Sequence, residues 1–304
     1  MRKNILPRIA IAACCILMTA CGREAIEENN TEPRAIQLTA NMPVSTPDTR
    51  VNYNFTGFDA DDTGMTGIPT TWEEGDEVTV HRAGQGRSHF TLENGKNSAS
   101  GTFTGTLPTG NNAMRVQYPK YSGSGINVQT QQQQTANAST AHLDAFNYMQ
   151  GKITGNEDDG YKANFVPQTA LFKFILTLPS GYSTEETFSS LKFEGPTGMK
   201  IWYISVDLGS ATGGNYITLG LNNIKPNASG VLTAYMMVPP NSSSTPPSIT
   251  IAADQTLTLR LTGSEKIYTF VLTVPTGGIT YTAGRAYVGK VGASDWTTVA
   301  PVTP

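Results

Sequence analysis

The sequence predicts an all-β protein made of two tandem antiparallel β-sandwich domains. From Ala35 onward, apolar and polar residues alternate in short runs, which is the period-two pattern of strands with one buried face. Gly, Pro and Asn punctuate these runs at short intervals, as in sandwiches and barrels. Charged residues make up only 15% of the chain, and helical periodicity is nearly absent.

Residues 1–20 predict an export signal of the lipoprotein type. They combine a basic start, a short apolar core and small residues immediately before Cys21. The apolar core is too short to cross a bilayer, which takes about 20 residues. We therefore expect cleavage before Cys21 and attachment of lipid to its sulfur. The alternative is an ordinary cleaved signal in which this cysteine is incidental.

Composition limits what the exported chain can do. No cysteine follows Cys21, so stability must come from burial and hydrogen bonding rather than from disulfides. The formal net charge is −3 and basic residues do not cluster, which argues against nucleic acid as a partner. Residues 21–34 are acidic, polar and unpatterned, and we interpret them as a flexible tether.

The first predicted domain covers residues 35–164. Ile36, Leu38 and Ala40 share one face of its first strand, and Trp72 is interpreted as a core anchor. Further strands are expected at Val51–Phe55, Val78–Val80, Phe90–Leu92, around Phe103, and at Met114–Tyr118.

Residues 119–164 interrupt this alternation. The run Gln129–Gln134 is low in complexity and predicts a solvated loop. A short helix is expected near His142 to Gln150, and Gly155–Gly160 predicts another loop.

The second predicted domain covers residues 165–304, and a loop rich in Pro and Ser at 239–247 interrupts it. Its strands are expected at Phe172–Leu178, Ile201–Val206, Ile217–Leu221, Val231–Val238, Ile249–Ile251, Leu257–Leu261 and Ile267–Val274, followed by a closing segment at Tyr281–Val291 and Asp295-Trp296.

No pattern predicts catalysis, a metal or a cofactor. His81 and His89 could face each other across a hairpin, but no third ligand stands at a zinc-site spacing. The acidic loop Asp59–Asp62 is similar to a calcium loop, yet Thr70 stands where its last acidic ligand would be, which favours a solvated turn. Nucleophile, phosphate-loop and zinc-protease motifs do not occur in the sequence. We therefore expect a protein that is not an enzyme.

The order of these motifs resembles the fimbrillin-like subunits of type V pili. The resemblance covers nearly the whole chain. Its motifs are the leader ending at Cys21, the strand at 35–40, Thr49-Arg50, the Trp-x-x-Gly-Asp-x-Val-x-Val hairpin at 72–80 and the closing segment 281–296. It implies two transthyretin-like sandwiches, a precursor anchored in the outer membrane through lipid on Cys21, and a place among other subunits of an adhesive cell-surface pilus, or fimbrium.

The resemblance also implies maturation by an arginine-specific protease. The cut would follow Arg50 and start the mature subunit at Val51. Arg34 is a competing site, but it precedes the first strand, so a cut there would not open a groove. Arg50 follows a Pro-containing stretch that we expect to be an exposed loop, where proteolysis is favoured.

Loss of the first strand would empty the slot that Ile36, Leu38 and Ala40 fill, and would expose two sheet edges. A strand from a neighbouring subunit could then complete the sheet. The expected donor is the C-terminal segment, about 286–302. The candidate anchor residues of this donor strand are Trp296, Ala300 and Val302, which could lie on one face.

Two other functions stay open at this point. The chain could be a monomeric surface lipoprotein that binds glycans through exposed aromatics such as Trp202-Tyr203. It could instead be a pilus anchor or accessory protein that keeps both its lipid and its first strand.

Overall fold

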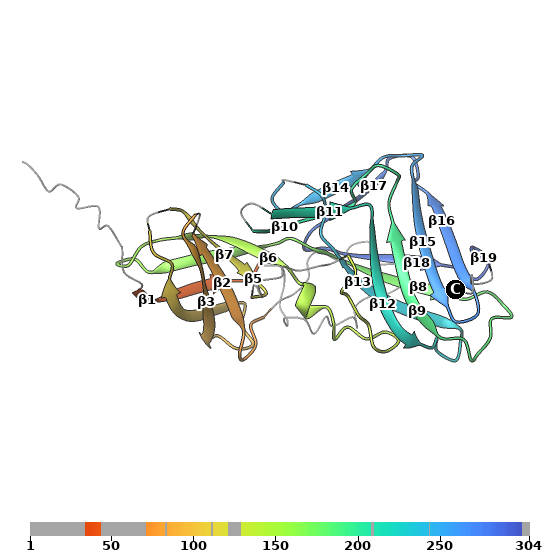
Figure 1. The fold of residues 1–304 in the computed structure, drawn as a ribbon, viewed down its shortest axis with the longest axis horizontal. Coiled ribbons are helices and arrows are strands. Elements are labelled where there is room, and N and C mark those ends of the chain that lie inside the picture. Colours follow the sequence, from red (N-terminus) through yellow and green to blue (C-terminus); the bar gives the residue numbers. More distant parts are fainter. Residues whose placement is uncertain are drawn as a thin grey trace, which may run out of the picture.

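The computed structural model describes residues 34–43, 71–82, 84–110, 112–120, 129–207, 210–242 and 244–299. It confirms the all-β prediction (Figure 1). One turn of 3-10 helix, η2 (Asp144–Phe146), lies where the sequence predicts a short helix. Within the described ranges, no helix is long and apolar enough to cross a membrane.

The N-terminal strands close into a barrel, at the left of Figure 1. They are β1 (Arg34–Asn41), β2 (Glu77–Arg82), β3 (Gly86–Asn94), β4 (Ser100–Leu107), β5 (Met114–Tyr118), β6 (Met149–Thr154) and β7 (Tyr161–Pro167). Their order around the barrel is β1-β4-β3-β2-β5-β6-β7, which places β1 between β4 and β7. Apolar side chains that alternate along these strands fill the barrel and form one core, centred on Trp72.

The remaining strands surround a second core. They are β8 (Ala170–Thr177), β9 (Phe188–Glu194), β10 (Trp202–Asp207), β11 (Ser210–Gly214), β12 (Tyr216–Ile224), β13 (Val231–Val238), β14 (Ser248–Ile251), β15 (Thr256–Gly263), β16 (Ile267–Thr273), β17 (Ile279–Thr282), β18 (Ala286–Val291) and β19 (Thr297–Val299). A five-stranded sheet, β12-β9-β15-β16-β19, shares this core with a three-stranded sheet, β13-β8-β18. Phe172 of β8 lies 5.4 Å from Phe193 of β9, measured between ring centroids, so the two sheets meet through aromatic side chains.

The sequence also predicts where the chain divides into two domains. The predicted boundary after residue 164 falls inside β7, and Phe165 packs in the barrel core against Trp72 at 5.6 Å between ring centroids. Strand pairing changes partners between Pro167 and Ala170 instead. Two tandem transthyretin-like sandwiches, and the domain limits given above, stay predictions.

The glutamine-rich run is not the solvated loop that its composition predicts. Residues 129–137, which we call the glutamine strap, lie along β12. Three backbone hydrogen bonds join the strap to β12. Gln129 O accepts from Thr218 N at 2.7 Å, and Gln132 O accepts from Gly220 N at 2.9 Å. Gln134 N donates to Gly220 O at 2.9 Å. Gln132 and Gln134 are fully buried, so the loop prediction is wrong for these two residues.

The side chains of the strap pair with the edge of β13. The Gln132 amide accepts from Met237 N and donates to Met237 O, both at 2.8 Å. Gln134 donates to Thr233 O at 2.8 Å and accepts from Tyr235 N at 2.9 Å. A side-chain amide carries the same donor and acceptor as a peptide group, so the strap substitutes for a neighbouring strand. It comes from the connection between β5 and β6, and it therefore ties the barrel to the second core.

Candidate functional site

The strand β1 closes the barrel. It pairs with β4 in antiparallel register at eight positions, from Arg34 opposite Leu107 to Asn41 opposite Ser100. On its other side it pairs in parallel with β7 at four positions, from Leu38 opposite Tyr161 onward. Both edges of β1 are thus hydrogen bonded, and removal of this strand would leave β4 and β7 as open edges.

The three residues of the predicted plug lie on the inner face of β1. Leu38 and Ala40 are fully buried, and Ile36 is partly buried against the same core. Sequence reasoning stopped one residue short, because Met42 extends the alternation and is only 2% exposed. The period-two spacing of residues 36, 38, 40 and 42 contains this signal.

Trp72 is hydrogen bonded to β1 near the C-terminal end of the strand. The Trp72 indole donates from Nε1 to the carbonyl O of Ala40 at 3.1 Å. Its ring meets Phe103 of β4 edge-on at 4.7 Å between centroids. Gly101 faces Ala40 in the register, and a Cβ on Gly101 would lie 2.6 Å from the Trp72 ring. The tryptophan occupies the space that a side chain at Gly101 would need.

Polar contacts hold the rims of β1. Arg34 forms a 2.6 Å ion pair with Glu157, both largely exposed. Asn41 donates to Asn164 Oδ1 at 3.0 Å. Exposed pairs of this kind contribute little, so most of the stability of β1 comes from its backbone pairing and buried side chains. Arg34 is the first residue of β1, so a cut after it would leave the rest of the strand in place.

The proposed processing residues lie outside the described residues. These are Cys21, Arg50 and Val51, and Ala300 and Val302 of the proposed donor lie outside them as well. The acidic loop at 59–62 also falls there.

The last described strand, β19, lies on the outer edge of the five-stranded sheet. β19 pairs with β16 at three positions only, and all three of its residues are exposed. Trp296 precedes it, donates from Nε1 to Thr177 O at 2.7 Å, and packs its ring against Tyr268 at 6.0 Å between centroids. Tyr268 is itself fixed by a 2.6 Å hydrogen bond to the buried Glu186 carboxylate. Burial, and then that hydrogen bond, raise the pKa of Tyr268, so the phenol stays a donor.

The upstream half of the expected donor is part of the protein's own sheet. β18 pairs in parallel with β8 at six positions. Releasing Ala286–Val291 would therefore dismantle the three-stranded sheet. Of the described residues in this segment, only those after Trp296 can detach without opening the second core, because Trp296 itself packs against that core.

Each described histidine has a hydrogen-bond partner within the protein. His81 and His89 are not opposite each other, because their register partners are Arg87 and Thr79. His81 bonds to Gln117 at 2.9 Å, His89 to Thr79 at 3.1 Å, and His142 to Tyr235 O at 3.0 Å. In the described part of the chain no three His, Cys, Asp or Glu side chains converge in a way that could hold a metal ion.

Comparison with known proteins adds distant likenesses. The sequence matches no protein-family model and no curated protein sequence at a significant level. Among solved structures, the chain is similar to a proposed cell adhesion protein of Bacteroides uniformis, with 13% identity and a TM-score of 0.44, covering 89% of this chain and 97% of that one. A proposed cell adhesion protein of Bacteroides ovatus gives 13% identity and a TM-score of 0.41, with the same shares covered.

The fimbrial anchor protein Mfa2 of Porphyromonas gingivalis is similar at 12% identity and a TM-score of 0.33, covering 74% of this chain and 78% of that one. These names are those of adhesion and fimbrial proteins, as the sequence resemblance leads one to expect. At these identities and TM-scores, the function proposed below has to rest on this chain's own residues.

Proposed function

We propose that this chain is a structural subunit of an adhesive cell-surface fimbrium, assembled by strand exchange after its first strand is cut away. One observation carries the proposal. β1 is fully integrated in a closed barrel, yet it is the first described element of the chain. A single cut behind it would separate it from the barrel while the rest of the chain stays continuous.

Loss of β1 would create a strong binding site. Each large apolar side chain that leaves the barrel takes about 1.5–3 kcal/mol of burial with it. The slot beside Trp72 would then be empty, and the edges of β4 and β7 would be unpaired. An incoming strand that supplies backbone hydrogen bonds and alternate apolar side chains would restore both. Because donor and acceptor surfaces differ, each added subunit leaves one free donor and one free acceptor, so the contact can repeat along a filament.

The donor in this proposal is the segment after Asp295, with Trp296, Ala300 and Val302 as its anchors. β19 is weakly attached to its own subunit, since its three residues are exposed and form only three register pairs, whereas Trp296 would have to give up its contacts with Thr177 and Tyr268. Exchange therefore replaces a short edge contact with a strand paired on both sides.

The finer parts of the proposal come from the family resemblance. They are two transthyretin-like sandwiches, a lipid on Cys21 that holds the precursor in the outer membrane, and a cut by an arginine-specific protease after Arg50 that leaves Val51 as the new N-terminus.

Limited digestion of the purified precursor with an arginine-specific protease tests the proposal. We expect a stable fragment that begins at Val51, followed by ladders that resist SDS. Arg50→Ala should abolish both the fragment and the ladders, whereas Arg34→Ala, the matched control, should leave both unchanged. A precursor that is cut at Arg50 and stays monomeric would contradict strand exchange. Filaments whose subunits retain residues 35–41 would favour a subunit that keeps its first strand.

A further inference from the structure

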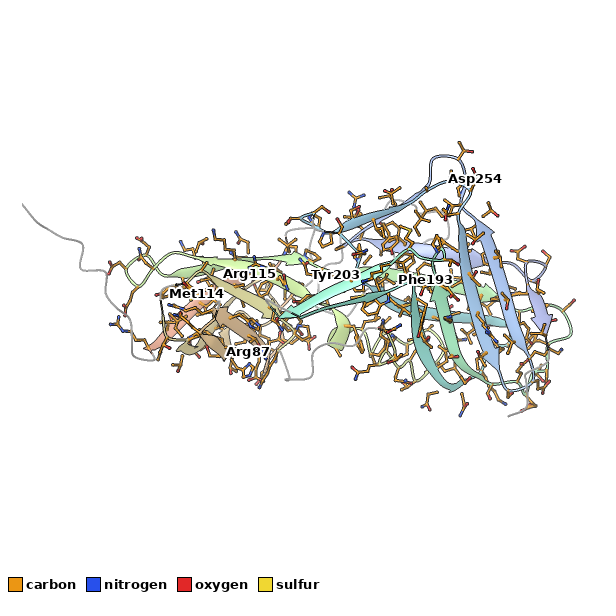
Figure 2. The ribbon with its side chains drawn as sticks, turned by 45° about the horizontal axis from the view of Figure 1, so that its top comes forward. Arg87, Met114, Arg115, Phe193, Tyr203 and Asp254 are labelled. Carbon is orange, nitrogen blue, oxygen red and sulfur yellow. The ribbon has the colours of Figure 1, made fainter. Side chains whose placement is uncertain are left out.

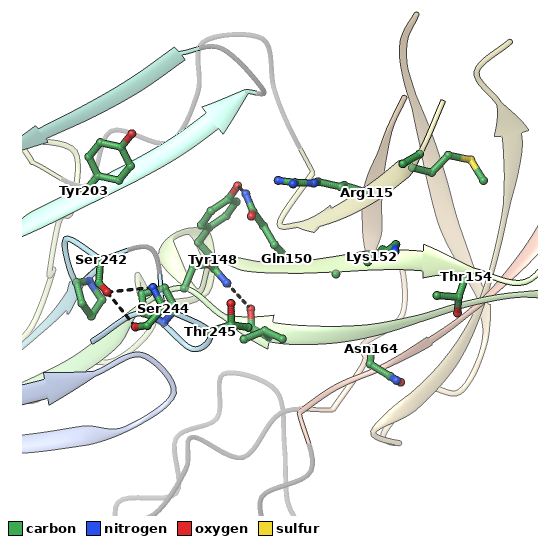
Figure 3. A pocket seen from close by; sticks show the side chains of 17 residues that line it. Arg115, Tyr148, Gln150, Lys152, Thr154, Asn164, Tyr203, Ser242, Ser244 and Thr245 are labelled. Carbon is green, nitrogen blue, oxygen red and sulfur yellow. Dashed lines mark hydrogen bonds between the residues drawn. The ribbon is translucent and has the colours of Figure 1, made fainter. Parts of the chain in front are cut away.

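A cleft with both polar and apolar lining lies between the barrel and the second core. Its volume is about 930 Å³. One wall comes from β5, β6 and β7, and the other from Tyr203 of β10 together with Pro240, Ser242, Ser244, Thr245 and Pro247. Figure 3 shows Tyr203 and the two serines on one side of the cleft, with Arg115 and Lys152 on the other.

Two cations stand directly opposite each other on the barrel wall of this cleft. Arg115 of β5 is the register partner of Lys152 of β6, and both side chains are exposed. Like charges directly opposite in an antiparallel pair destabilise a sheet. Among the described residues neither cation forms an ion pair, and none of the residues lining the cleft is acidic. The barrel therefore holds two adjacent positive charges that nothing described neutralises.

A second cross-strand cation pair shows what compensation looks like. Arg260 faces Lys192 in the five-stranded sheet. There Lys192 lies 2.8 Å from the Glu194 carboxylate and 4.3 Å from the centre of the Tyr216 ring. The cleft pair has no counterpart to Glu194, although the protein as a whole carries a net charge of −3.

The row of register partners continues from this pair toward β3. Arg115 faces His81 of β2, which is buried and bonded to Gln117, and His81 faces the exposed Arg87 of β3 (Figure 2 labels Arg87 and Arg115). The adjacent cations Arg115 and Lys152, beside a concave wall, attract an oppositely charged ligand and raise its local concentration.

The rest of the lining suits a saccharide. Tyr203 is 36% exposed, so part of its ring is open to the cleft as an apolar face with a polar tip. The other polar side chains of the lining are neutral amides and hydroxyls that can both donate and accept hydrogen bonds, from Tyr148, Gln150, Thr154, Asn164, Gln168, Ser242, Ser244 and Thr245.

From this arrangement we infer that the cleft binds an acidic saccharide. Its carboxylate is held by Arg115 and Lys152, and one of its rings stacks on Tyr203. Arg binds carboxylates with two parallel hydrogen bonds, and Lys adds a second charge beside it. The inference goes beyond the proposed filament role, because the cleft is on the outside of the barrel and does not involve the slot of β1.

Titration calorimetry on the full, uncut chain tests the inference with sugars that differ in one group. Oligogalacturonate should bind, and the binding should weaken as salt is raised, because exposed charges are screened. The neutral oligosaccharide of galactose lacks the carboxylates and should bind at least about tenfold more weakly, which is the effect of one lost charge-assisted hydrogen bond. Acetate serves as the probe for a simple carboxylate without a sugar ring.

Three variants separate the parts of the site. Arg115→Gln combined with Lys152→Gln should reduce oligogalacturonate binding by about tenfold or more. Tyr203→Ala should reduce oligogalacturonate binding while leaving any binding of acetate unchanged. Arg260→Gln, the matched control, removes an exposed cross-strand cation from the other sheet and should change nothing.

The unliganded protein gives an independent readout. Removing the repulsion between Arg115 and Lys152 should raise the melting temperature of the double variant above that of the wild type, as expected where charges are kept for a ligand. The inference is overturned if oligogalacturonate does not bind, if the neutral oligosaccharide binds equally well, if acetate binds as tightly as oligogalacturonate, or if the double variant binds like the wild type. Because uncut monomer is used, failure here leaves the filament proposal untouched.

Discussion

The indole of Trp72 donates a hydrogen bond to the carbonyl oxygen of Ala40, across 3.1 Å inside the barrel. Trp72 lies just before β2, and Ala40 belongs to β1, the strand that we propose is removed from the subunit. The contact is fully buried, so neither group has water as an alternative partner. Trp72 therefore both fills the core and positions the end of β1.

Replacing Trp72 with Phe should loosen β1. The substitution keeps an aromatic ring but leaves the Ala40 carbonyl without its partner, which costs about 1–3 kcal/mol of the free energy of unfolding. Hydrogen exchange should quicken along β1. The matched control is Trp202→Phe, because Trp202 donates to Tyr216 O at 2.7 Å in the second core. If exchange in β1 responds equally to both variants, the specific link is wrong.

Replacing Leu38 with Ala should destabilise the uncut protein by about 2–5 kcal/mol, since Leu38 is fully buried and its loss leaves a cavity. Urea unfolding measures this change. Its neighbour Gln37 is exposed on the same strand, and Gln37→Ala should stay within about 0.5 kcal/mol. A small effect at Leu38 would mean that the first strand does not fill the slot.

In the glutamine strap, a buried and an exposed glutamine stand next to each other, so one can serve as the control for the other. Gln132→Leu should cost about 1–3 kcal/mol for each group of Met237 that it leaves unpaired. Gln133→Leu changes the adjacent, exposed residue of the same run and should have little effect. Equal effects of the two substitutions on the free energy of unfolding would show that the strap does not pair with β13 in solution.

His142 should make stability depend on pH. Burial lowers the pKa of His142, although its hydrogen bond to Tyr235 O opposes the shift. In the unfolded chain the His142 side chain has a pKa of about 6.5, so as the solution is acidified the unfolded state binds more protons than the folded state. The contribution of His142 is therefore fully present above about pH 7.5 and is lost as the pH falls toward 5.

Urea unfolding at a series of pH values, compared between the wild type and His142→Gln, isolates this contribution, because the amide of Gln can still donate to Tyr235 O. The difference in the free energy of unfolding between the two proteins should change between pH 7.5 and 5, with the wild type losing more. A difference that is constant with pH would contradict the assigned burial.

Alternation and turn residues in the sequence predicted which side chains of a strand face the core. The alternation at Ile36, Leu38 and Ala40 identified the inner face of β1, and the position of Trp72 before a Gly-Asp turn identified a core anchor. The closing of the barrel could not be predicted, because the parallel pairing of β1 with β7 joins residues more than 100 positions apart.

The glutamine run shows the opposite limit. Its composition is that of a solvated segment, and nothing local indicates that Gln132 and Gln134 meet the unpaired edge of a strand about 100 residues later. The closing segment misled in a similar way. The alternation through Ala286–Val291 could not reveal that β18 pairs with β8, and nothing local indicates that Trp296 packs against the second core.

A reversible lock on β1 tests the central claim most directly. Thr39 and Thr102 are register partners on β1 and β4, at a separation that suits a disulfide. In a chain that starts after Cys21, Thr39→Cys with Thr102→Cys would tie the first strand to the barrel even after cleavage at Arg50. The account predicts that cut, oxidised subunits stay monomeric and that a reductant starts polymerisation. Polymerisation of the oxidised, cut subunits at the rate of the wild type would contradict it.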